Sequence, residues 1–131
     1  MTPIPHAEDL GRARTAADFA AVIALLDTDL NNAAARKQEL EQAEDSAIFG
    51  DGDLGEVRAA LDDCNAAIAL LEKTIEAADS RRAAAAQGEA RADIVALGDE
   101  IRSKAASLGE RWRTVHRLIE RCARSCSRPI P

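Results

Sequence analysis

Aromatic residues are almost missing from this sequence, which has no tyrosine, one tryptophan and two phenylalanines among its 131 residues. Aromatic and β-branched side chains are those that pack best on a pleated sheet, so their scarcity argues against a sheet protein. Alanine, leucine, glutamate and arginine dominate instead, and they are strong helix formers. With apolar residues repeating at a heptad-like period, this composition is typical of long helices and coiled coils. We therefore expect an all-α protein.

Long hydrophobic runs are also lacking. No apolar run approaches the ~20 residues that a membrane-spanning helix needs. The first nine residues have no basic stretch followed by a hydrophobic core, so they do not form a secretory signal. The three cysteines, Cys64, Cys122 and Cys126, are an odd number, which in a chain that is not secreted favours free thiols. We expect a cytoplasmic protein with no membrane partner.

Motifs that carry catalysis or bind metals are missing. Asp51, Asp53 and Asp62 have the spacing of an EF-hand calcium loop, but Glu56 stands at the sixth position, where that loop needs glycine. Turn formation and helix capping explain these aspartates better. The glycines around Asp51 are not followed by the Lys-Ser/Thr of a phosphate-binding loop, and they follow a helical pattern instead of a strand.

Zinc binding is not predicted either. His116, Cys122 and Cys126 could gather on one side of a helix, but a structural zinc ion takes four ligands, and Cys64 would have to arrive from elsewhere. Cys64 reads as a small apolar core residue. We expect no catalytic residue, no cofactor and no metal, and therefore no enzyme.

The chain divides around a turn at residues 50–53, Gly-Asp-Gly-Asp, because glycine and aspartate accept turn geometry. Residues 1–14 form an N-terminal arm, loose apart from one short turn around Ala7–Arg12. Thr15 and Asp18 form a capping box that begins a helix ending near residue 49, and Asp53 with Glu56 forms another that restarts the chain as a helix. Residues 15–88 are thus predicted to form an antiparallel coiled-coil helical hairpin.

Each arm of this hairpin carries a seam of residues spaced alternately by three and four positions. The first seam consists of Phe19, Ile23, Leu26, Leu30, Ala33, Lys37, Leu40, Glu44 and Ala47. The second consists of Leu54, Val57, Leu61, Cys64, Ile68, Leu71, Ile75, Ala78, Arg82 and Ala85. Folding the chain at the turn pairs the seams layer by layer, from Ala47 with Leu54 to Phe19 with Arg82.

The frame is lost around Gly88, where a helix could end, although a continuous helix with shifted phase also fits. Residues 89–126 are predicted to form a third helix, followed by a tail at residues 127–131. Its apolar stripe is Ile94, Leu97, Ile101, Ala105, Leu108, Trp112, Val115, Ile119, Cys122 and Cys126. This helix either folds back to complete a three-helix bundle or projects as a stalk that pairs with another subunit.

Charge is distributed unevenly along the chain. Residues 1–100 hold 9 Lys and Arg against 21 Asp and Glu, whereas residues 101–131 hold 8 against 2. Six arginines are expected near one face of the third helix, beside its apolar stripe, and they are Arg102, Arg113, Arg117, Arg121, Arg124 and Arg128. The first five of these arginines, together with Trp112, are the candidate partner-binding residues.

Three interpretations of this basic face compete. It could pack against the acidic hairpin of its own or a partner chain, meet an acidic surface of another protein, or contact nucleic-acid phosphates. Arginine suits phosphate, but the net charge of −6 repels a polyanion. Trp112 is interpreted as a core anchor of the third helix, because no other aromatic residue stands beside it to form a base-stacking platform.

Alanine- and glutamate-rich heptads flank the run Ala-Ile-Phe-Gly-Asp-Gly-Asp-Leu-Gly-Glu-Val-Arg-Ala-Ala-Leu on both sides. This segment, roughly residues 30–85, carries a family resemblance. It resembles small coiled-coil hairpin proteins encoded in tailed-phage and prophage regions of bacteria. The resemblance implies a phage-associated structural or assembly role, with virion association as a location, and it carries over no functional residue. We expect a non-enzymatic structural or protein-binding assembly factor that self-associates, with nucleic-acid binding by the arginines as the alternative.

Overall fold

The computed structural model describes residues 3–126, and all regular secondary structure in that range is helical. Helix α1 spans Ala7–Arg12, α2 spans Ala16–Ile48 and α3 spans Leu54–Cys126. The chain forms two compact units, one ending at Glu89 and the other beginning at Ala90. The predicted all-α fold class is confirmed. The predicted tail at residues 127–131 and Arg128 lie outside the described residues.

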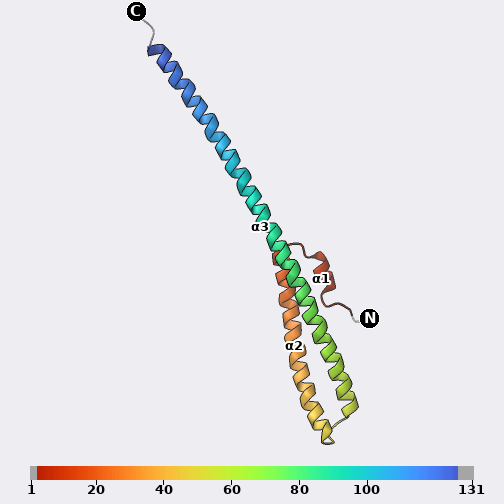
Figure 1. Cartoon of the computed structure of the whole chain (residues 1–131). Coiled ribbons are helices and arrows are strands. Elements are labelled where there is room, and N and C mark those ends of the chain that lie inside the picture. The colour runs from red at the N-terminus through yellow and green to blue at the C-terminus, as the bar shows by residue number, and fades with distance from the viewer. Residues whose placement is uncertain (1–2, 127–131) are drawn as a thin grey trace, which may run out of the picture. The chain divides into compact units, whose positions relative to one another are not determined.

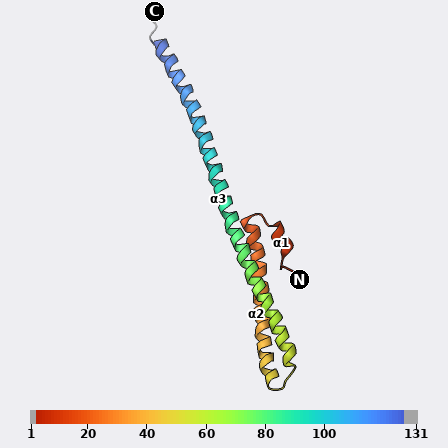
Figure 2. The same ribbon diagram turned by 45° about the vertical axis from the view of Figure 1, so that its right-hand side comes forward.

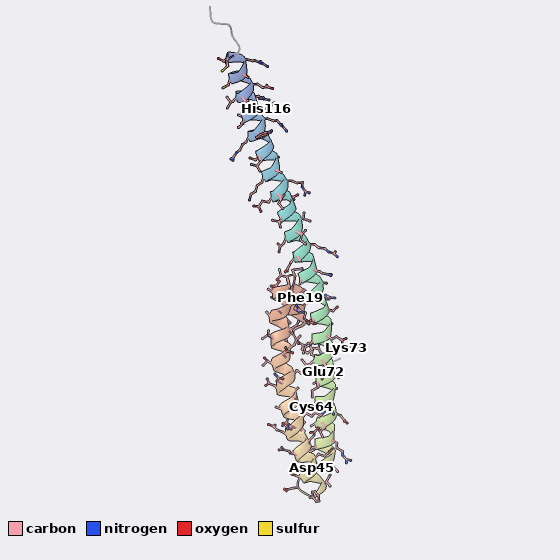
Figure 3. All side chains as sticks on the ribbon, turned by 60° about the vertical axis from the view of Figure 1, so that its left-hand side comes forward. Phe19, Asp45, Cys64, Glu72, Lys73 and His116 are labelled. Carbon is pink, nitrogen blue, oxygen red and sulfur yellow. The ribbon has the colours of Figure 1, made fainter. Side chains whose placement is uncertain are left out.

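The first unit is a helical hairpin in which α2 lies beside the first part of α3 (Figures 1 and 2). Every residue of both predicted seams is buried or partly buried. The core cluster of Val22, Leu26 and Leu71 packs against Leu30 and Ile75, and it thereby contains both members of two predicted layers. Cys64 lies between the helices (Figure 3), where its Sγ donates a hydrogen bond to the Ala33 carbonyl at 3.3 Å.

The turn between α2 and α3 depends on its glycines. Gly50 and Gly52 have φ angles of 94° and 111°, in the left-handed region that side chains with a Cβ atom disfavour. Asp53 then caps α3, because its Oδ1 accepts the backbone N–H groups of Gly55 at 2.9 Å and Glu56 at 3.3 Å. The reciprocal bond of the predicted capping box, in which the Asp53 N–H donates to the Glu56 carboxylate, is not formed in this segment.

The predicted capping box of α2 is complete. The Thr15 hydroxyl accepts the Asp18 N–H at 3.1 Å, and Asp18 Oδ2 accepts the N–H groups of Thr15 and Arg14, each at 3.1 Å. A further N–H group in the first turn of α2, that of Ala16, is capped from far along the chain, because it donates to Glu89 Oε1 at 2.9 Å. The open end of the hairpin is therefore joined by a side chain 73 residues away from the helix that it caps.

The short turn predicted around Ala7–Arg12 is confirmed as helix α1. The prediction of an otherwise loose arm is wrong over its described residues, because the arm is docked on the hairpin. Leu10 of α1 packs against the core cluster, and Ala13 is buried. His6 has a left-handed backbone conformation, and its Nε2 lies 2.8 Å from Asp29 Oδ2 on α2. The arm was misread because its few apolar residues have no helical period of their own and become informative only against the hairpin.

Residues 89–126 are not a separate third helix, because α3 continues without a break through Gly88 to Cys126. The alternative of one continuous helix with a shifted phase is the one observed. Glycine weakens a helix by only ~1 kcal/mol relative to alanine, and no proline follows to force an end. The helix therefore does not end at Gly88. A different set of residues forms its apolar face beyond that point.

Candidate protein-binding surface

The second unit contains one helical segment, residues 90–126 of α3, and its apolar stripe is exposed. Trp112 is 71% exposed, Ile94 69% and Leu108 64%, and the least exposed large apolar residue of the stripe, Val115, is still 45% exposed. Single exposed apolar residues are ordinary on protein surfaces, whereas a continuous row of this length is a candidate interaction surface.

The stripe has the period of a coiled-coil seam. From Ile101 to Cys126, the spacing alternates between four and three residues without interruption, and such a repeat keeps apolar residues on one side of a helix. A single helix has nothing against which to bury such a side. The prediction that Trp112 anchors a core is wrong for the single chain, in which the indole is mostly in solvent.

The candidate arginines do not share a face beside the stripe. At about 100° of rotation per residue, Arg117 and Arg121 lie roughly 140° and 180° around the helix from Trp112. Arg113 and Arg124 belong to the same side, and we call these four residues the arginine face. Arg102 lies closer to the stripe and pairs with Asp99. The sequence pattern placed the arginines together because several share a three- or four-residue spacing, but that spacing does not say how far they stand from the apolar row.

The ion pairs of this unit leave much of the arginine face uncompensated. Lys104 pairs with Glu100 at 3.0 Å, and His116 approaches Glu120 at 3.4 Å, both between residues one helical turn apart. Within residues 3–126, no carboxylate forms an ion pair with Arg113, Arg117 or Arg121. Figure 3 shows His116 among side chains that spread outward all around this helix.

A shallow groove lies in the first unit, between α1 and the hairpin. Its volume is ≈ 490 Å³, and apolar side chains form most of its wall, including Leu10, Phe19 and Ala78. Lys73 and Arg81 are the charged residues of its lining. Sequence reasoning missed this groove because it exists only where α1 packs on the hairpin.

The hairpin tip carries a second apolar feature. Phe49 is 89% exposed and the preceding Ile48 is 55% exposed, directly before the glycine turn. The sequence predicts that a helix ends near Phe49. The only sequence feature that indicates an exposed side chain there is its position beside the two glycines of the turn.

Metal-binding and membrane-spanning features are absent from the described part of the chain. No group of three or more His, Cys, Asp or Glu side chains in residues 3–126 is placed to hold a metal ion. None of the helices described is long and apolar enough to cross a membrane. The cysteines are free, with Cys64 partly buried and both Cys122 and Cys126 exposed.

Comparisons with protein-family models, curated proteins and solved structures found no match to this chain.

Proposed function

We propose that this chain is a non-enzymatic coiled-coil protein that acts by binding protein through its apolar stripe, and that its first partner is a second copy of itself. The observation that carries the proposal is the heptad spacing of the exposed stripe residues from Ile101 to Cys126. Apolar residues repeat at this spacing along a helix when another helix packs against them.

A second copy is the favoured occupant because it supplies a seam of equal length and the same period. Each large aliphatic side chain that becomes buried contributes about 1.5–3 kcal/mol, and the stripe holds six of them besides Trp112 and the small residues. The family resemblance of residues 30–85 adds a phage-associated structural or assembly role, and this part of the proposal rests on the resemblance alone.

Self-association is tested by sedimentation of the full chain and of Leu108→Glu. The proposal predicts a concentration-dependent oligomer, and a dimer loses two buried leucines in the variant. That loss weakens association by at least about 3 kcal/mol, or roughly a hundredfold in Kd. Ser103→Glu introduces the same side chain on the opposite side of the helix, so it should leave the Kd unchanged. A wild-type chain that stays monomeric at high micromolar concentration would rule out self-association.

Nucleic-acid binding by the arginine face is the second candidate function. It is favoured by the absence of ion pairs at Arg113, Arg117 and Arg121, and by their position away from the stripe, which leaves them accessible in a self-associated protein. Arginine neutralises phosphate and releases condensed counterions, so such binding weakens steeply as salt rises.

Fluorescence anisotropy with a labelled DNA duplex tests this second function. Binding at low salt that falls with added salt, and that disappears in the triple variant Arg113→Glu, Arg117→Glu, Arg121→Glu, is the expected result. Replacing Arg12, Arg36 and Arg58 of the first unit by glutamate gives a control with the same change in charge. Equal loss in both triple variants would indicate a response to net charge, and no binding at low salt would eliminate this function.

A further inference from the structure

The order of large and small residues along the stripe carries information on how two copies pair. The regular four–three alternation continues back from Ile101 through Gly98 to Ile94, so Gly98 takes the seam position and Leu97 of the stripe lies beside it. Two small residues, Gly98 and Ala105, therefore lie in one half of the seam, and the bulky Trp112 lies near its middle. In a parallel pair each residue meets its own copy, so glycine faces glycine, alanine faces alanine and tryptophan faces tryptophan. This arrangement leaves gaps in some layers and crowds another, whereas close packing sets large residues against small ones.

An antiparallel pair gives more even layers. When residue numbers in facing positions sum to 220, all ten seam positions are used, and every layer combines an a with a d position. The facing pairs are Ile94 with Cys126, Gly98 with Cys122, Ile101 with Ile119, Ala105 with Val115 and Leu108 with Trp112. The bulkiest layers adjoin Gly109, which has no side chain to crowd the indole.

Charge points to the same orientation. Residues 1–89 carry 8 Lys and Arg against 18 Asp and Glu, a net charge of −10. In a parallel pair, residue 90 of one copy lies beside residue 90 of the other, and this brings the attachment points of two acidic hairpins together. Antiparallel pairing separates the two copies of residue 90 by roughly 60 Å along the pair, at 1.5 Å per residue. That separation is several times the Debye length of ~8 Å at physiological salt.

We propose that the apolar stripe pairs antiparallel with the stripe of a second copy, about a two-fold axis near Glu110, with Leu108 of each copy packed against Trp112 of the other. The proposal rests on the self-association proposed above and adds its orientation and register. Such an interface is isologous, because the same surface serves both copies, and it closes as a dimer.

Disulfide trapping between two differently tagged chains tests the orientation. The first chain keeps Cys122 as its only cysteine, through Cys64→Ala and Cys126→Ala. The second carries Gly98→Cys, with all three natural cysteines replaced by alanine. The Gly98 position tolerates a side chain, because a Cβ there meets only Arg102 Nη2 at 3.7 Å. The chains are mixed, allowed to exchange and oxidised with oxidised glutathione, and the products are separated by mass.

Antiparallel pairing predicts that the link between the two different chains exceeds either self-link by at least tenfold, because only residues in the same layer are close enough for a disulfide. In 6 M guanidinium chloride this preference should vanish. A dominant self-link of the first chain through Cys122 would overturn the antiparallel orientation. If Gly98→Cys perturbs folding, Ala105→Cys in one chain and Val115→Cys in the other probe a second predicted layer in the same way.

Sedimentation of the same mixtures separates the two proposals. A dimer with the wrong cross-links contradicts only the orientation. A monomer at high micromolar concentration contradicts self-association, and the orientation falls with it.

Discussion

At the scale of single residues, the start of α2 is held by a compact set of hydrogen bonds. Asp18 Oδ2 accepts two backbone N–H groups, from Arg14 and Thr15. The Arg14 and Thr15 N–H groups, together with the Thr15 hydroxyl, hold the pKa of Asp18 below its ordinary value of 3.8. Hydrogen bonds to the charged form of a carboxyl favour that form. The cap is therefore coupled to pH.

The sign of this coupling gives a prediction. Because the pKa of Asp18 is lower in the folded than in the unfolded chain, its contribution to the free energy of unfolding is complete above pH 3.8 and is lost as the pH falls through the folded-state pKa. Asp18→Asn should lower the urea midpoint at pH 7, and the difference from wild type should shrink near pH 2.5. Glu41→Gln, at an exposed position of α2 far from its N-terminal cap, is the control. A difference that is the same at both pH values would contradict this role of Asp18.

At the scale of elements, the hairpin combines two long helices with a turn that only glycine forms without strain. Leu26 is fully buried, and few other side chains are, because two helices and the short α1 enclose little volume. The turn geometry and the seam packing therefore carry much of the stability of the first unit. Glycine has opposite effects in these settings, since it permits positive φ in the turn and weakens the interior of a helix.

Three single substitutions test this contrast. Gly50→Ala and Gly52→Ala should each lower the free energy of unfolding by roughly 1–2 kcal/mol, because a Cβ atom opposes their positive φ. Gly88→Ala should raise it by about 0.5–1 kcal/mol, because Gly88 is inside α3 and a Cβ there meets nothing within 4 Å. Chemical denaturation followed by circular dichroism measures all three. A destabilised Gly88→Ala protein would mean that a helix break at this position matters.

At the scale of the whole molecule, the two units differ in what stabilises them. The hairpin has its own core cluster, whereas the helix of the second unit buries none of its large apolar side chains. Most helices in folded proteins are stabilised by packing of an apolar face and not by intrinsic propensity. If a second copy supplies that packing, helix formation in the second unit depends on association.

Dilution should therefore reduce the helix content. Residues 90–126 are 37 of the 112 residues in α1, α2 and α3, so the helical circular dichroism signal should fall by up to about a third as the protein dissociates. Leu108→Glu should show the lower signal at concentrations where the wild type is associated, and Ser103→Glu should follow the wild type. A signal that does not change with concentration, while sedimentation shows dissociation, would contradict the coupling.

The sequence by itself determined the helical class, the turn at residues 50–53, the Thr15 cap and both hairpin seams, because these follow from local propensity and from a spacing that two helices share. The tertiary structure alone revealed the docking of α1 through His6 and Leu10, and the capping of Ala16 by Glu89, because these contacts join segments with no common period. The structure also shows that α3 continues through Gly88, because the free-energy cost of one glycine is small compared with the hydrogen bonds that a continuous helix keeps. The heptad pattern foretold the apolar stripe, but only the structure showed that this stripe is exposed in the single chain, because a period identifies the face that a helix will bury and not the partner that covers it.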